Sequence, residues 1–130
     1  MNASRTTTSF ADGTNEKLEL HIKAFKDRDY RAIADRFFAS DVHWAFEGYP
    51  PLHGREAISD FYSQVVTNSA VAIKPVASAS TLTTGWTLID YFVEPHDAAV
   101  DPWTYRTIFT WSLRDGEWLV DSAMGIKTPS

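Results

Sequence analysis

The sequence contains no cysteine among its 130 residues. That absence excludes disulfide bonds, a thiolate nucleophile and cysteine-ligated metals, and it fits the cytoplasm, where we expect the protein to reside. The chain also lacks a run or stripe of Lys and Arg, and its formal net charge is −5. Because binding phosphates requires clustered positive charge, a nucleic-acid partner is not expected.

Long apolar runs are missing as well. No segment has the length of a membrane span or of a signal-peptide core, so we expect no membrane association. The sequence has no glycine-rich phosphate loop, no nucleophile elbow and no histidine pair at metal-ligand spacing beside an acid, so neither a metal nor another cofactor is expected. Residues 1–13 are polar and predicted to be loosely ordered, and residues 14–127 are predicted to form one domain.

Aromatic residues, in contrast, are abundant. The chain has five Trp, five Tyr and eight Phe, and 44% of its residues are hydrophobic. So many large rings in a chain of this length favour either a thick core or the wall of an apolar pocket.

Three segments have the apolar period of a helix. They are residues 15–25, with Thr14 as the expected N-cap, residues 30–38, with Asp29 as the cap, and residues 54–66. Because only Asp27 and Arg28 separate the first two, we expect a sharply bent or antiparallel pair.

Strands are predicted later in the chain, after an alternating segment at residues 41–47. Residues 71–80 are interrupted by Pro75, which indicates an edge strand or a bulge. Residues 85–94, 103–113 and 117–126 are rich in aromatic and β-branched residues, and Asp115-Gly116 is a strong hairpin signal. Helices followed by a run of strands predict an α+β fold, with the helices on one face of a curved sheet.

The hairpin signal also predicts which side chains point inward. With a two-residue turn, Trp111 pairs with Val120, Phe109 with Ser122 and Thr107 with Met124. This register places the aromatic residues of the strand inside and directs Arg106 and Asp121 outward. On residues 85–94, Trp86 and Asp90 share one face, which we assign to the interior.

The order of the elements and two segments resemble a known superfamily. The segments are AFKDRDYRAIADRFFASDV (residues 24–42) and PLHGREAISDFY (residues 51–62). They are similar to the nuclear-transport-factor-2-like superfamily, which includes ketosteroid isomerases, scytalone dehydratase, limonene epoxide hydrolase and SnoaL-type polyketide cyclases. The resemblance implies a cone: a curved antiparallel sheet packed on three helices around an apolar cavity. It also implies a homodimer that forms through the outer sheet face.

The catalytic residues of the isomerases are mostly absent from the matching positions. Ala45 stands where the resemblance implies the carboxylate base, and Phe109 stands at or near the second acid. His21 replaces the tyrosine of the oxyanion hole, while Phe61 and Tyr62 match a pocket-lining aromatic pair. The isomerase reaction is therefore not expected.

Four ionisable residues remain as catalytic candidates. His21 lies on the apolar stripe of its helix, and a carboxylate at Asp90 among apolar neighbours needs a partner or a raised pKa. The two could form an acid/base unit, assisted by His43 and Glu47, which the alignment places on the cavity face. Three of them have a structural alternative: a hydrogen-bonded core histidine at His21, a structural hydrogen bond of Asp90, and a rim carboxylate at Glu47. The apolar trio Val42, Trp44 and Phe46 also favours the opposite orientation of that strand.

Two functions follow from these candidates. One is a SnoaL-like, cofactor-independent enzyme that uses proton transfer on a small apolar or polycyclic substrate, as an isomerase, cyclase, dehydratase or epoxide hydrolase. The other is a non-catalytic module of the same fold that binds a small hydrophobic molecule or forms a dimer. In both, the expected walls of the cavity are Trp44, Phe61, Tyr62, Trp86, Tyr105, Phe109, Trp111 and Met124.

Overall fold

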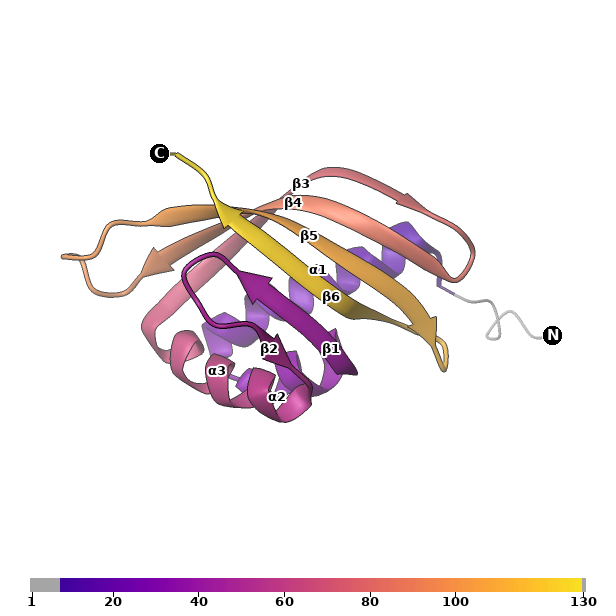
Figure 1. Ribbon diagram of the computed structural model, residues 1–130, viewed down its shortest axis with the longest axis horizontal. Helices are drawn as coiled ribbons and strands as arrows, with labels where there is room; N and C mark the ends of the chain where they lie inside the picture. The colour runs from indigo at the N-terminus through magenta and orange to yellow at the C-terminus, as the bar shows by residue number, and fades with distance from the viewer. Residues whose placement is uncertain (1–7, 130) are drawn as a thin grey trace.

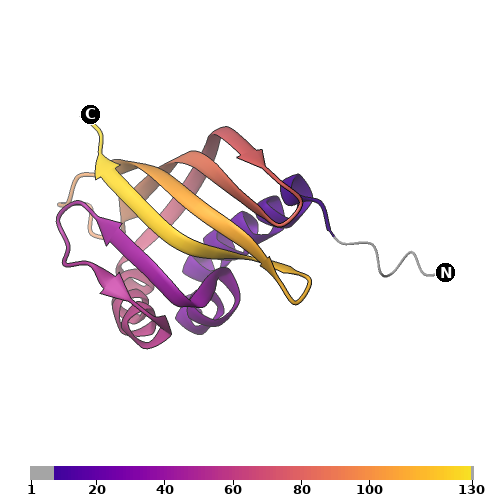
Figure 2. The ribbon, with the colours of Figure 1, turned by 45° about the vertical axis from the view of Figure 1, so that its right-hand side comes forward.

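The computed structural model describes residues 8–129 as helices packed on one face of a curved sheet (Figure 1). The elements are α1 (Phe10–Asp27), α2 (Tyr30–Ala32), the π-helical turn η2 (Ile33–Phe37), β1 (Phe38–Phe46), β2 (Leu52–His53), α3 (Arg55–Asn68), β3 (Ser69–Ser80), β4 (Thr84–Pro95), β5 (Trp103–Arg114) and β6 (Glu117–Lys127). The sheet order is β2-β1-β6-β5-β4-β3, and every pairing is antiparallel except β1 with β6. The predicted α+β cone is confirmed, and Figure 2 shows the curl of the sheet over the helices.

Helix α1 begins earlier than predicted. Ser9 is its N-cap, and the Ser9 hydroxyl accepts a hydrogen bond from the backbone N–H of Asp12 at 3.1 Å. Phe10 then packs edge-on against the ring of Trp118, with 5.1 Å between ring centroids. The prediction that residues 10–13 are loosely ordered is therefore wrong, because this contact and the cap stabilise the first helical turn. Residues 1–7 of that predicted lead lie outside the described residues.

The sharp bend between α1 and α2 follows the local sequence. Arg28 adopts a left-handed conformation with φ of 58°, and its N–H donates to the carbonyl groups of Ala24 and Phe25. The side chain of Asp29 then caps the next turn by accepting from the N–H of Ala32 at 3.2 Å. The predicted cap and the predicted bend are both confirmed.

Strand β3 and the final hairpin also follow their sequence signals. β3 is an edge strand, and its register shifts between Pro75 and Ala77, so both predictions drawn from Pro75 hold. Asp115 and Gly116 have φ values of 52° and 82°, as a two-residue hairpin turn requires, and Trp111 pairs with Val120 as expected.

A bulge beyond that pair changes the rest of the hairpin. Trp111 faces Val120 while Thr110 faces Ser122, so Asp121 is an extra residue in β6. The Asp121 carboxylate accepts from Arg114 at 2.5 Å and from the Ser112 hydroxyl at 2.9 Å, which stabilises the bulge.

From the bulge onward the predicted register is wrong by one residue. Phe109 pairs with Ala123, and Thr107 pairs with Gly125. Because successive side chains alternate between faces, Met124 points away from the helices and is 60% exposed instead of lining the interior.

Candidate functional site

An aromatic cavity opens between the helices and the sheet. We call it the ring-lined pocket, and its volume is about 210 Å³. Its lining residues come from α1, β1, the turn after β1, α3 and strands β3–β5: Phe25, Trp44, Phe46, Tyr49, Phe61, Tyr62, Val65, Asn68, Ser69, Val71, Tyr91, Val93, Trp103 and Tyr105. None of them is Asp, Glu, Lys, Arg or His. An apolar pocket with a few polar groups is the usual form of a small-molecule site.

The inward-facing side chains of α3 and β1 form one wall of this pocket. Ile58, Tyr62 and Val66 of α3 are buried, and Phe61 stands beside that stripe. On β1, Trp44 is buried, and its ring lies 4.7 Å from that of Phe61. Burial of these large rings on one side of the sheet supplies much of the core's stability as well as the wall.

Asp90 lies on the other side of the sheet. Its strand neighbours are Lys74 and Arg106, and the Arg106 guanidinium donates to its carboxylate at 2.6 Å and 3.4 Å. The buried residues of β4 are instead Thr87, Ile89, Tyr91 and Val93. The predicted placement of Asp90 in the cavity is therefore wrong, because its charge is compensated on the outer face by Arg106.

His43 and Glu47 are also outside the cavity. Val42, Trp44 and Phe46 are buried, so the apolar trio and not the alignment determines which face of β1 points inward. The exposed ring of His43 stacks on that of His53, with 4.1 Å between centroids. The Glu47 carboxylate accepts from the backbone N–H of Lys127 at 2.8 Å, which joins the ends of β1 and β6.

His21 is buried as predicted, but behind the pocket wall rather than in it. Its side chain is 0% exposed, and its Nε2 lies 2.6 Å from the Tyr91 hydroxyl. Its Nδ1 has no hydrogen-bond partner among the described residues. Burial lowers the pKa of His21 to about 3, so the imidazole is neutral near pH 7.

Four phenol hydroxyls belong to tyrosines that line the pocket: Tyr49, Tyr62, Tyr91 and Tyr105. That of Tyr62 accepts from the indole Nε1 of Trp44 at 3.2 Å, and that of Tyr105 donates to the backbone carbonyl of Glu47 at 2.8 Å. Burial raises the pKa of Tyr62 and Tyr91 well above the ordinary value of a phenol and that of Tyr105 to about 12. At neutral pH the pocket therefore has neutral hydroxyl groups and no ionised side chain.

Comparison with known proteins assigns the fold to a family. The family model described as a SnoaL-like domain matches residues 18–120. The chain belongs to the SnoaL-like family. No curated protein sequence matches it significantly.

Several solved structures share the fold of this SnoaL-like protein at low identity. A ketosteroid isomerase-like protein from Erwinia carotovora atroseptica is 14% identical, with a TM-score of 0.74 over 91% of this chain and 95% of that one. An NTF2-like protein with a cystatin-like fold from Novosphingobium aromaticivorans is 12% identical, with a TM-score of 0.80 over 92% and 82%. A putative calcium/calmodulin-dependent protein kinase II association domain from Xanthomonas campestris is 16% identical, with a TM-score of 0.75 over 95% and 94%. These likenesses support the nuclear-transport-factor-2-like fold and leave the activity open.

Four of the predicted wall residues line the pocket of the SnoaL-like protein: Trp44, Phe61, Tyr62 and Tyr105. Phe109 and Trp111 are buried beside Phe37 in the core and do not line it. Trp86 and Met124 are exposed on the outer face.

Sequence reasoning missed several lining residues, of which Tyr91 and Trp103 matter most. Tyr91 follows Asp90 directly, so the wrong choice of face for Asp90 removed Tyr91 from the predicted cavity. The predicted outward position of Arg106 was a signal that could have placed Asp90 correctly. Opposite charges on neighbouring strands favour the same face, so Asp90 would point outward with Arg106 and Tyr91 would point inward.

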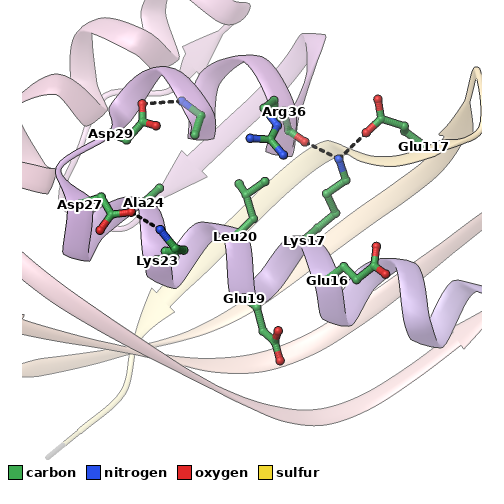
Figure 3. Close-up of a pocket in the computed structure, with 11 residues that line it drawn as sticks. Glu16, Lys17, Glu19, Leu20, Lys23, Ala24, Asp27, Asp29, Arg36 and Glu117 are labelled. Carbon is green, nitrogen blue, oxygen red and sulfur yellow. Dashed lines mark hydrogen bonds and ion pairs between the residues drawn. The ribbon is translucent and has the colours of Figure 1, made fainter.

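A second hollow lies between α1, the α2–η2 segment and the start of β6 (Figure 3). Lys17 spans it, donating to the Glu117 carboxylate and to the backbone carbonyl of Arg36, both at 2.8 Å. Lys23 forms an ion pair with Asp27 at 2.5 Å within the same groove. Because these charged groups already pair with one another, we assign the groove a structural role that joins α1 to η2 and β6.

None of the described helices is long and apolar enough to cross a membrane.

Proposed function

We propose that this SnoaL-like protein binds a small, neutral, apolar molecule in the ring-lined pocket. The observation that carries the proposal is the wall itself: aromatic rings enclose about 210 Å³, and no lining residue is ionised at neutral pH. Apolar surface gains free energy on leaving water, whereas a charged ligand would lose its hydration without a compensating partner.

Proton-transfer catalysis has less support from this geometry. An acid/base pair requires two ionisable groups that can both reach the reacting atoms of one substrate. Their pKa values must also lie near the working pH. Asp90 is on the outer face beside Arg106, and His21 stands behind Tyr91 with a pKa near 3. Binding without chemistry is therefore the function that we favour.

The test is a titration with tetralin, a neutral bicyclic hydrocarbon, followed by isothermal calorimetry. We expect saturable binding with a negative heat-capacity change, the mark of apolar burial. Val65 of α3 lines the pocket and is half-buried, so Val65→Phe should fill part of the space and weaken binding about tenfold. Val100→Phe makes the same change at an exposed turn and should leave the affinity unchanged. Wild-type protein that binds no tetralin would refute the proposal.

We also infer that two copies associate through the outer sheet face. Large apolar side chains are exposed there: Trp86, Phe92, Ile108, Met124 and Ile126. Exposed apolar surface of this kind marks interaction sites. Lys74, Asp90 and Arg106 form a charged row across the middle of the face. A two-fold axis that passes between Asp90 and Arg106 would bring the guanidinium group of each copy against the carboxylate of the other.

Sedimentation velocity tests this association. We expect a dimer for the wild type and a monomer for Ile108→Asp, because a carboxylate would be desolvated at the contact. Leu82→Asp, at the exposed turn between β3 and β4, is the control and should remain dimeric. A monomeric wild type at high protein concentration contradicts the inference.

A further inference from the structure

We propose that the ligand carries a carbonyl oxygen, and that the hydroxyls of Tyr62 and Tyr91 both donate hydrogen bonds to it. This inference rests on the proposed binding function and specifies its chemical class: a neutral cyclic ketone or a related carbonyl compound. Both tyrosines are almost completely buried, and both line the ring-lined pocket.

The Tyr62 hydroxyl has a proton with no assigned acceptor. Its partner is the indole Nε1 of Trp44 at 3.2 Å, and an indole nitrogen can only donate. The oxygen of Tyr62 must therefore be the acceptor in this bond. Its own O–H hydrogen remains available to a molecule in the pocket.

The Tyr91 hydroxyl also has a proton without an acceptor, because of its hydrogen bond with His21. The neutral imidazole carries one proton, and it has two possible positions. If that proton were on Nδ1, it would be a buried donor without a partner, enclosed by the rings of Phe25 and Phe37. With the proton on Nε2, the imidazole donates to the Tyr91 oxygen at 2.6 Å, and only an acceptor nitrogen is left unpaired.

The second arrangement moves the unpaired donor to the pocket wall. An unsatisfied donor in a closed apolar site is destabilising, whereas the freed O–H of Tyr91 can be satisfied by a ligand or by water. His21 is thus a positioning residue: it orients the Tyr91 hydroxyl and does not line the pocket itself.

The two hydroxyl-bearing rings flank one imidazole. The ring centroid of His21 lies 5.8 Å from that of Tyr62 and 5.4 Å from that of Tyr91. Burial raises the pKa of Tyr91, and the proximity of Tyr62 raises it further, so both phenols keep their protons and remain donors. The buried Nε1 of Trp103 is a further donor of this wall, and it lies close to the Tyr105 hydroxyl.

Such a donor-rich apolar wall matches one kind of ligand. A carbonyl oxygen has two lone pairs and can accept two hydrogen bonds, while the ring system that carries it contacts the aromatic wall. A carboxylate ligand would bring a negative charge to a pocket whose lining includes no Lys, Arg or His. A neutral carbonyl compound therefore fits this wall best.

The experiment compares 1-tetralone with tetralin, which differ by the carbonyl group. The measured quantity is the ratio of their dissociation constants in each variant. We expect Tyr62→Phe and Tyr91→Phe each to lower the preference for the ketone about fivefold, because each removes one hydrogen bond. The matched control is Tyr30→Phe. Tyr30 belongs to α2 and does not line the ring-lined pocket, so removal of its hydroxyl should leave the preference unchanged.

A second measurement needs no variant. The C=O stretching band of 1-tetralone bound to the wild type should lie at lower frequency than in an apolar solvent, since two hydrogen bonds weaken the bond. If tetralin binds but the ratio is the same in all variants, or the band lies at its apolar-solvent frequency, the carbonyl inference is wrong and the binding function stands. If neither compound binds, both proposals fail.

Discussion

The burial of His21 makes the stability of this protein dependent on pH. Its side chain is 0% exposed, and burial lowers its pKa from 6.5 to about 3. Below pH 6.5 the unfolded chain binds a proton at this residue that the folded chain does not bind. Stability is therefore fully present above pH 6.5 and is lost as the pH falls from 6.5 toward 3.

The size of this effect follows from the shift. Each pH unit in that interval lowers the free energy of unfolding by about 1.4 kcal/mol, so the loss at pH 5 is about 2 kcal/mol. Urea unfolding at several pH values between about 5 and 7.5, followed by tryptophan fluorescence, measures it. This range covers most of the interval in which the unfolded chain takes up a proton at His21 that the folded chain does not.

Two variants isolate the contribution of His21. His21→Phe removes the titrating group, and the pH dependence between 7.5 and 5 should largely disappear. The variant should also be less stable at pH 7.5 by about 1–3 kcal/mol, because the Tyr91 hydroxyl loses its partner. His96→Gln removes an exposed histidine and should keep the wild-type dependence. Equal pH dependence in the wild type and in His21→Phe would refute the reasoning.

Two further predictions concern the sheet. Gly125→Ala should lower the free energy of unfolding by about 1–3 kcal/mol in urea, since a Cβ there would lie 2.5 Å from ring carbons of Phe46; unchanged stability would show that this contact relaxes freely. Asp90→Asn should leave the affinity for tetralin unchanged in calorimetry, because Asp90 lies with Arg106 on the face away from the pocket; loss of binding with the fold intact would restore Asp90 to the site.

Local sequence signals predicted the elements well because each acts over a few residues. Asp115-Gly116 specified the hairpin, Asp29 the second helix cap, and Pro75 the edge strand with its bulge. The predicted helix at residues 30–38 is shorter, since a π-helical turn follows Ala32 and β1 begins at Phe38, and the short strand β2 was not predicted. The start of α1 was also missed, because Ser9 and the contact between Phe10 and Trp118 extend the helix. That contact joins residues distant in sequence, so no local pattern could reveal it.

The site was predicted less well because alternation tells which residues share a face but not which face is inside. On β4 the two sets are similarly apolar, and the choice that placed Asp90 inside excluded Tyr91. On β1 the alignment outweighed the apolar trio that includes Trp44, although burial follows hydrophobicity. Met124 was misplaced by the bulge at Asp121, which depends on an ion pair with Arg114.

The five tryptophan indole N–H signals in a ¹H–¹⁵N spectrum test the ring-lined pocket most directly. Trp44 and Trp103 line it, Trp86 is on the outer face, and the indole groups of Trp111 and Trp118 donate to Thr87 and to the carbonyl of Thr8 in other parts of the structure. Addition of tetralin should shift the signals of Trp44 and Trp103 and leave the other three in place. Shifts at Trp86 alone, or no shift at any of the five, would contradict the account.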